Sequence, residues 1–310
     1  MNILEKTDFK NLGEKYTGKV RDVYIQNDKV ILISTDRYSA FDRNLAIIPC
    51  KGQVLTQVSK FWFENTSDIV KNHALDFPDP NVVVGKKCKV LPIEVVPRAY
   101  ITGVTGTSLW TLYQGGMRNF VDFTLPDGLH KNQKLDQVVL TPTTKFEEHD
   151  RPLSSKDIIE GSYMTKDQWE KVADLSLKLF KRGQEIALAH GLILVDTKYE
   201  FGLDKNDEVI LIDEIHTPDS SRYWQAKTYE ELIAKGLEPE NFDKEFLRLW
   251  FKDNCDPYKD EKLPETPAEM VTELSRRYIQ ICEQITGVPF VIENGDLEKR
   301  IENNLKKYQI

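Results

Sequence analysis

The sequence predicts a mixed α+β and α/β fold with two lobes, a small antiparallel β lobe over an α/β lobe, followed by C-terminal helices. Strand-like runs fill the first hundred residues, a capped helix precedes strand, turn and strand near the middle, and the last part of the chain is helical. A chain of 310 residues can bury a core in two or three lobes. We therefore expect a β-rich lobe over residues 1–97, an α/β lobe carrying the candidate site over residues 98–225, and a packed helical region over residues 226–310.

β-branched residues mark the expected strands of the first lobe, and turn-forming residues such as Gln26-Asn27-Asp28 separate them. One helix is expected among these strands, from about Gln53 to Asn65, because apolar residues recur along it at helical spacing. The expected strands cover residues 15–24, 30–35, 46–48, 82–90 and 93–96.

The expected second lobe contains the helix with the clearest boundaries. Thr165 is a suitable N-cap, Gln168 completes a capping box with it, and Gly191 follows the last turn. Residues 126–160 are polar and without periodicity, which predicts a long loop. Near the C-terminus, Thr266-Pro267-Ala268-Glu269 combines a cap, a proline at the first helical position and a glutamate at the third, which predicts another helix.

Composition excludes several classes of protein. The formal net charge of −8 argues against nucleic acid as the main partner, because binding to a phosphate backbone needs a basic surface. An anionic small substrate would therefore be held by a local cluster of Lys and Arg. The four cysteines are scattered without a CxxC pair, and no apolar run approaches membrane length. We expect a cytoplasmic protein with reduced thiols and no membrane partner.

The segment from Leu194 to Gly202 carries the strongest candidate site. Asp196, Lys198 and Glu200 alternate with apolar or bulky residues, so on a strand they share one face. The apolar run over residues 209–212 is the expected return strand of a hairpin.

The turn of this hairpin decides what Glu200 faces. A two-residue turn at Asn206-Asp207, or a four-residue loop centred on it, sets Glu200 opposite Asp213 with side-chain origins about 5 Å apart. A three-residue loop would turn Asp213 to the other face. Two carboxylates so close repel unless a proton or a cation lies between them. With Lys198 on the same face, this arrangement predicts a site for Mg²⁺ and a polyphosphate; the alternative is a salt-bridged strand facing solvent.

Two further segments of the first lobe have candidate polar sites. Lys19 and Arg21 follow Gly18 between two strand-like runs and can fold over a polyphosphate, although a basic surface hairpin has the same pattern. Ser34, Asp36 and Ser39 belong to a stretch dense in hydroxyl and carboxylate groups, which suits recognition of a polar ligand. The alternative for this stretch is a capped turn that leads into the next element.

Two segments near the boundary between the expected lobes could recognise a nucleotide or a phosphate. The extended backbone of Glu94, Val95 and Val96 could offer its N–H and C=O groups to an adenine edge, and the next cation, Arg98, could bind a phosphate or carboxylate. Residues 101–108 are rich in small side chains and lead into a helix, where backbone amides bind anions.

Arg222 follows a serine pair just after the acidic hairpin and suits a substrate phosphate. The sequence has no Cys/His metal spacing, no GxSxG elbow and no Ser/His/Asp order, and the lone histidines His149 and His216 suit structural or merely polar roles.

Taken together, these segments resemble the SAICAR (phosphoribosylaminoimidazole-succinocarboxamide) synthetase family. The matching stretches occur in the family's order between Gly18 and Trp224; they are GKVRDVY, STDRYSAFD, KGQVLTQVSKFWF, LPIEVVPRAYITG, TPTTK with EEHD, LVDTKYEFG, and LIDEIHTPDSSRYW. One departure is an apparent insertion at residues 104–107, between the arginine of EVVPR and the helix entry. We place the family's substrate-contacting position at Ser108 instead of the Thr102-Gly103 pair.

The resemblance implies a two-lobed fold related to ATP-grasp enzymes and distantly to protein kinases. It also implies an ATP-dependent ligase of purine biosynthesis, which joins L-aspartate to the carboxylate of the imidazole ribotide CAIR and yields SAICAR, ADP and phosphate. Oligomeric state and the residues of the aspartate pocket stay open. Other activities compatible with the residues alone are a small-molecule kinase on a related scaffold and a non-catalytic nucleotide sensor.

The resemblance also distributes roles over the candidate residues. It implies Mg²⁺ ligands at Glu200 and Asp213, ATP phosphates at Lys19 and Arg21, and adenine at the Glu94–Val96 backbone. It implies a catalytic role for Lys198, beside the transferring phosphoryl group and the ribotide. The expected substrate-binding residues are Ser34, Asp36, Ser39, Arg98, Ser108, Asp196 and Arg222.

Overall fold

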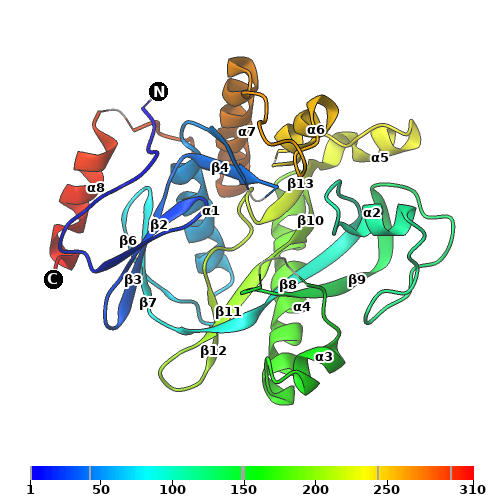
Figure 1. The fold of residues 1–310 in the computed structure, drawn as a ribbon, viewed down its shortest axis with the longest axis horizontal. Coiled ribbons are helices and arrows are strands. Elements are labelled where there is room, and N and C mark those ends of the chain that lie inside the picture. Colours follow the sequence, from blue (N-terminus) through cyan, green and yellow to red (C-terminus); the bar gives the residue numbers. More distant parts are fainter. Residues whose placement is uncertain (1, 42, 148–150, 243, 294) are drawn as a thin grey trace.

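Two antiparallel sheets form the frame of the protein, seen side by side in Figure 1. The structure is a computed structural model that describes residues 2–41, 43–147, 151–242, 244–293 and 295–310. His149, a lone histidine of the sequence, lies outside the described residues. The first sheet has the order β1-β2-β3-β7-β6. Its strands are β1 (Glu14–Thr17), β2 (Arg21–Ile25), β3 (Lys29–Ser34), β6 (Ala74–Asp79) and β7 (Val82–Lys86).

The second sheet carries the acidic hairpin. Its order is β12-β11-β8-β10-β13, with β9 paired to β8, and every pairing is antiparallel. A separate two-stranded sheet joins β4 (Arg37–Ala40) to β5 (Arg43–Ile47). The strands of the second sheet are β8 (Lys89–Ile101), β9 (Gln133–Thr144), β10 (Leu192–Thr197), β11 (Tyr199–Leu203), β12 (Val209–Ile212) and β13 (Ser221–Gln225).

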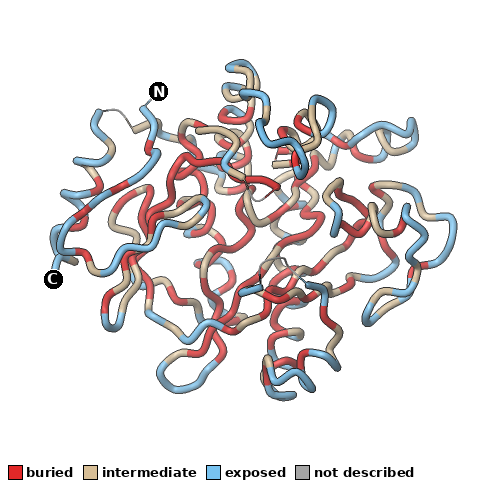
Figure 2. The backbone as a smooth tube through the Cα atoms, viewed as in Figure 1, coloured by how far each residue is buried: buried red, intermediate tan, exposed pale blue. Residues whose placement is uncertain are grey.

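Helices cover the sheets and bury their apolar faces. In Figure 1 α4 (Lys166–Ala189) lies against the second sheet, where it packs on β10 and β8, while α1 (Lys51–Asn65) contacts both β3 and α7 (Ala268–Thr286). Figure 2 shows that the buried backbone concentrates in the strands of both sheets and in the elements between them. The other helices are α2 (Leu109–Gln114), α3 (Ser155–Glu160), α5 (Ala226–Ala234), α6 (Glu245–Asn254), α8 (Leu297–Leu305) and the short η1 (Lys306–Tyr308). Over the part of the chain that the structure describes, none of these helices has the length and apolarity needed to cross a membrane.

The expected boundary between the lobes at residue 97 falls inside a strand. The predicted run over residues 82–90 is divided between β7 of the first sheet and β8 of the second. Residues 93–96 are the middle of β8 and not a separate strand. The chain therefore changes sheets at residues 87–88, where a short connector replaces the expected continuous strand.

Local signals at the helix ends predicted the helices well. α4 begins after Thr165 with the expected capping box to Gln168, and Gly191 follows it with a φ of 75°. The cap of α7 was predicted one residue too early, because Pro267 is its N-cap. Thr266 instead donates its hydroxyl hydrogen bond to the Leu45 carbonyl, 3.1 Å away.

The prediction of a long loop over residues 126–160 was wrong. The whole of β9 and the whole of α3 lie within this segment. Among the described residues β8 is the one strand that pairs with β9, and the other edge of β9 is bridged only at its end, where Thr143 pairs with Pro152 and the Leu153 N–H donates to the Pro142 carbonyl at 3.0 Å. A strand with a largely open edge tolerates proline and a polar sequence. The pairing of β9 with a strand about forty residues earlier leaves no local turn pattern to detect, which is why periodicity missed it.

Two buried histidines make stability depend on pH. His216 is fully buried, with Nε2 hydrogen-bonded to the Tyr199 hydroxyl and its ring edge-on to Trp62, which agrees with the expected structural role. Burial lowers the pKa of His216 to about 3 and that of His73 to about 4. Because both folded-state pKa values lie below the ordinary value, the unfolded chain takes up protons first as the pH falls below about 6.5.

We expect each of these two histidines to contribute about 1.4 kcal/mol of acid destabilisation between pH 7.5 and pH 5.5. Urea unfolding of the wild type and of His216→Gln at both pH values isolates the contribution of His216. The gap in unfolding free energy between the two proteins should shrink by about 1.4 kcal/mol at the lower pH. A gap that does not change with pH would show that His216 is not held neutral by the fold.

Candidate active site

The acidic hairpin has a different register from the one predicted. Glu200 of β11 lies opposite Ile212 of β12, so the expected direct pairing of Glu200 with Asp213 was wrong. The connecting loop covers residues 204–208, an odd number of positions, with Asp207 in the left-handed region at a φ of 59°. An odd loop shifts the pairing by one residue relative to the two- or four-residue loop expected.

A backbone turn nevertheless brings Asp213 to the same side as Glu200. Asp213 follows the end of β12 and has a φ of 66°, which takes it out of the alternation of the strand. Both carboxylates line one cavity of about 170 Å³ between the two sheets. The left-handed residue therefore restores the proximity that the register alone would remove.

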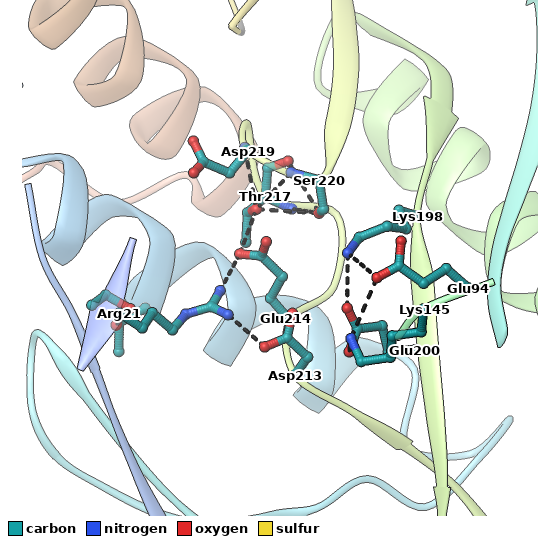
Figure 3. A network of polar contacts seen from close by, with 12 residues as sticks. Arg21, Glu94, Lys145, Lys198, Glu200, Asp213, Glu214, Thr217, Asp219 and Ser220 are labelled. Atoms are coloured by element: carbon teal, nitrogen blue, oxygen red, sulfur yellow. Dashed lines mark hydrogen bonds and ion pairs between the residues drawn. The ribbon is translucent and has the colours of Figure 1, made fainter. Parts of the chain in front are cut away.

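Glu200 lies among cations and one further acid. Its Oε1 accepts a hydrogen bond from Lys198 Nζ at 2.8 Å, and its Oε2 forms an ion pair with Lys145 (Figure 3). Glu94 shares both lysines, at 2.8 Å from Lys198 and 3.3 Å from Lys145. Burial would raise the pKa of Glu200, but the two lysines outweigh it and lower this pKa far below the usual range. The same ion pairs overcome burial at Lys198 and raise its pKa, so Lys198 stays protonated at neutral pH.

Arg21 joins the first lobe to the acidic loop. From β2 its guanidinium reaches both Asp213 Oδ1, at 2.5 Å, and the carboxylate of Glu214, as Figure 3 shows. Lys19 lies in the turn before β2, where the Gly18 N–H donates to the Arg21 carbonyl at 2.8 Å. Burial would lower the pKa of Arg21, but the two carboxylates outweigh it and raise this pKa. The glycine turn and its two cations thus form the hairpin that the sequence predicted.

The walls of the smaller cavity are mostly aliphatic. Besides Glu200 and Asp213 it is lined by Val23, Val30, Leu32, His73, Lys86, Cys88, Val90 and Ile212. The connector between β7 and β8 runs along it through Cys88. A flat apolar slot beside two carboxylates and Arg21 matches the needs of a purine base followed by phosphates.

The predicted adenine contact at Glu94, Val95 and Val96 is contradicted by the sheet. This segment pairs with β9 along its whole length, and Glu94 and Val95 also pair with β11. Val95 is completely buried, while Glu94 and Val96 line a second cavity. Glu94 and Val95 therefore have their backbone groups committed to strands on both sides and Val96 has β9 on one side, so the segment is not the open connection that was expected.

The second cavity is larger, about 310 Å³, and collects most of the predicted substrate residues. Arg98 and Arg222 both contact Asp196 Oδ2, at 3.0 and 2.5 Å, on neighbouring strands. Ser108 lies at the N-cap of α2, and its hydroxyl donates to the Thr105 carbonyl at 2.8 Å. The lining residues are Glu94, Val96, Arg98, Thr105, Thr107, Ser108, Asp196, Thr197, Lys198, Pro218, Asp219, Ser220, Ser221, Arg222, Lys244 and Arg248.

Several site residues were missed by the sequence. Lys145 follows β9 in a stretch that was noted without a role, and Lys244 and Arg248 come from α6 and its N-cap. Lys244 Nζ lies 3.0 Å from Asp219, which also pairs with the fully buried Lys51 at 2.8 Å. Burial lowers the pKa of Lys244 to about 8. A lysine and an arginine four residues apart in a helical segment are common on protein surfaces, so nothing local marked this pair.

Three predicted substrate residues lie elsewhere. Asp36 is buried, and its carboxylate accepts hydrogen bonds from the backbone N–H groups of Leu4, at 2.8 Å, and Gly52, at 2.9 Å. Ser34 accepts from the Thr56 hydroxyl at 3.1 Å, and Ser39 lies in β4. None of the three lines either cavity among the residues that the structure describes. Burial raises the pKa of Asp36, and its backbone contacts tie the first residues of the chain and of α1 to the connection between β3 and β4.

The carboxylates at the smaller cavity suit a magnesium ion that is shared with a nucleotide. No group of three or more His, Cys, Asp or Glu side chains suited to a metal occurs among the described residues. Mg²⁺ commonly binds through one or two carboxylates together with substrate phosphates. Glu200 and Asp213 line the same cavity and could supply the two carboxylates. The donor set therefore fits a metal that binds together with a polyphosphate.

The two cavities define the class of protein. Lys198 lines the larger, cationic cavity and Glu200 lines the smaller, apolar one, and their side chains touch. This geometry is that of a nucleotide-dependent enzyme that activates an anionic small molecule.

Comparison with known proteins identifies the family. The model of the SAICAR synthetase family matches residues 14–265, and the chain belongs to this family. It is 56% identical over 298 residues to the phosphoribosylaminoimidazole-succinocarboxamide synthase of Legionella pneumophila strain Paris, covering 96% of each chain.

Solved structures of the family share the fold. A SAICAR synthase from Saccharomyces cerevisiae complexed with SAICAR superposes with a TM-score of 0.78 at 31% identity, covering 93% of this chain and 99% of that one. A type 2 SAICAR synthetase in complex with ADP has a TM-score of 0.69 at 25% identity, covering 90% of this chain and 100% of that one. The two-lobed SAICAR synthase-like fold that the sequence predicted is thereby confirmed.

Proposed function

We propose that this protein ligates L-aspartate to the carboxylate of CAIR with ATP, giving SAICAR, ADP and phosphate in purine biosynthesis. Membership of the family supports this activity. The observation that carries it is the contact between Lys198 and Glu200, because it joins the cavity suited to a nucleotide to the cavity suited to anionic substrates. A phosphoryl group leaving the first cavity would enter the second beside Lys198.

The chemistry explains why the site needs no protein nucleophile. A carboxylate does not condense with an amine in water, because its oxygen is a poor leaving group. Phosphorylation of the carboxylate gives an acyl phosphate, which an amine can attack with loss of phosphate. This route needs close positioning and neutralised charge, and the site provides both through its paired lysines and arginines.

For the nucleotide we propose the smaller cavity. Its aliphatic walls and the connector at Lys86 and Cys88 would hold the adenine, in place of the strand segment first expected. Lys19 and Arg21 would contact the phosphates, and Glu200 and Asp213 would hold Mg²⁺. When bound, the cation would neutralise phosphate charge and act as a Lewis acid on the transferred group.

For the ribotide we propose the larger cavity. Arg98, Ser108 and Arg222 would contact its anionic groups, with Asp196 orienting the two arginines through the ion pairs described. The five cations that line this cavity are Arg98, Lys198, Arg222, Lys244 and Arg248, and the three acids are Glu94, Asp196 and Asp219. The surplus of positive charge suits two anionic substrates together, so we place L-aspartate in the same cavity, with Lys244 and Arg248 as candidate contacts.

An ADP-release assay tests the proposed function. With ATP, Mg²⁺ and CAIR present, we expect ADP release to depend on L-aspartate and the product mass to contain both substrates. ADP release without aspartate, with phosphorylated CAIR as the product, would instead show a small-molecule kinase. Nucleotide binding without turnover under any of these conditions would show a sensor.

A further inference from the structure

Arg21 is held by two consecutive carboxylates with different surroundings. Asp213 lines the smaller cavity, and its side chain is 25% exposed. The side chain of Glu214 is only 9% exposed, and Glu214 lines neither of the two cavities described. Figure 3 shows the guanidinium between the two acids, with one edge toward each. Asp213 can therefore meet a ligand in the cavity, whereas Glu214 acts only through its neighbours.

The carboxylate of Glu214 has a second partner besides Arg21, on the same oxygen. Its Oε2 accepts a hydrogen bond from the Thr217 hydroxyl at 2.9 Å. The backbone N–H of Thr217 donates to the Ser220 hydroxyl at 3.1 Å, and the Ser220 carbonyl accepts from the Lys198 N–H at 2.9 Å. Glu214 thus belongs to a hydrogen-bonded loop that is anchored to the backbone of Lys198, and its position does not depend on Arg21 alone.

Nucleotide binding would place competing demands on Asp213. A carboxylate that ligates a cation holds a guanidinium more weakly, because the two positive charges repel each other and share the one negative charge. If Asp213 alone held Arg21, the side chain of Arg21 would then be anchored less firmly and would regain rotamer freedom. Glu214 removes this problem, since it holds one edge of the guanidinium while the other N–H donors turn to phosphate.

We propose that Glu214 is a positioning residue, which keeps Arg21 directed at the nucleotide phosphates once Asp213 is given over to the cation. The inference deepens the proposed function and depends on it, because it needs Arg21 to contact the nucleotide. Glu214 itself touches neither nucleotide nor substrate. Its effect on the nucleotide is exerted only through the position of Arg21.

A double-mutant cycle measured by ADP binding tests the proposal. The four proteins are wild type, Arg21→Gln, Glu214→Gln and the double variant, with affinity for ADP measured calorimetrically in EDTA and again in Mg²⁺. We expect Glu214→Gln to weaken ADP binding about tenfold in Mg²⁺, which corresponds to the loss of a charge-assisted contact, and to weaken it less in EDTA, where Asp213 still holds Arg21. Since Glu214 acts through Arg21, the double variant should bind ADP no more weakly than Arg21→Gln alone.

Losses that add in the double variant would overturn the proposal, because they would mean that Glu214 supports the loop independently of Arg21. An unchanged ADP affinity in Glu214→Gln would overturn it as well. If Glu214→Gln does not fold, Thr217→Val replaces it in the cycle; a roughly threefold loss that disappears in the Arg21→Gln background would support the proposal. Additivity there would again overturn it.

ADP binding does not require ligase turnover, so this inference and the proposed function can fail separately. Normal aspartate-dependent turnover with an additive cycle would refute the role of Glu214 alone. Failure of the wild-type protein to release ADP in an aspartate-dependent way would instead refute the ligase assignment.

Discussion

Glu200→Gln is expected to lower kcat at least 10²-fold while leaving the fold intact. The substitution keeps the size of the side chain but removes the charge that holds Lys198 and Lys145 beside the cavity. It also removes one of the two proposed Mg²⁺ ligands, so the Mg²⁺ concentration needed for half-maximal activity should rise. Steady-state kinetics with ATP, CAIR and L-aspartate over a series of Mg²⁺ concentrations measures both effects.

Glu208→Gln provides the matched control. Glu208 lies in the loop of the same hairpin, pairs with the exposed Lys71 at 2.7 Å, and lines neither of the two cavities. The same substitution there should leave kcat within about twofold of the wild type, because an exposed ion pair contributes little. A value of kcat within about threefold of the wild type for Glu200→Gln would contradict the proposed role of this carboxylate.

Gly52→Ala is expected to reduce the free energy of unfolding by roughly 3 kcal/mol, the largest stability effect that we predict. Gly52 lies in the first turn of α1 against β3. An added Cβ would lie 2.3 Å from the carbonyl oxygen of Ser34 and 2.7 Å from its carbonyl carbon. Both atoms belong to the backbone of a paired strand, so the helix itself must shift. Urea denaturation followed by circular dichroism measures the loss.

Gly106→Ala is the corresponding control, since a Cβ added at Gly106 would meet no heavy atom within 4 Å and the φ of this residue is not in the left-handed region. We expect this variant to unfold within about 0.5 kcal/mol of the wild type. Equal unfolding midpoints for Gly52→Ala and the wild type would mean that α1 can move away from β3 without cost.

Alternation along one extended segment was enough to find the centre of the site, although the structure divides this segment at Lys198 into β10 and β11. Asp196, Lys198 and Glu200 were predicted to share a face because side chains alternate on an extended chain, and all three line one or other of the cavities. The register with Asp213 could not be obtained in the same way. It depends on the length of the loop and on a left-handed residue at the strand end, and turn-forming residues do not specify either.

Long-range pairing explains most of what the sequence did not predict. The Glu94–Val96 segment looked like an open connection, because no local pattern indicates its pairing. In the structure β9 pairs with all of it on one side, and β11 pairs with Glu94 and Val95 on the other. Asp36 looked like a ligand-binding carboxylate, yet its partners are backbone amides at Leu4 and Gly52, one of them about thirty residues away. Polar side chains of one type serve ligands and backbone equally well, and only the tertiary structure decides between them.

The contact between Lys198 and Glu200 joins two residues whose backbone separation is fixed by the sequence. Two residues apart on an extended chain, they are separated by at most about 7 Å of backbone, and both belong to the same lobe. Opening or closing of the sheets against each other would leave this spacing unchanged. The junction between the two proposed binding cavities is thereby built into one covalent segment, and relative motion of the sheets would serve to admit and release the reactants.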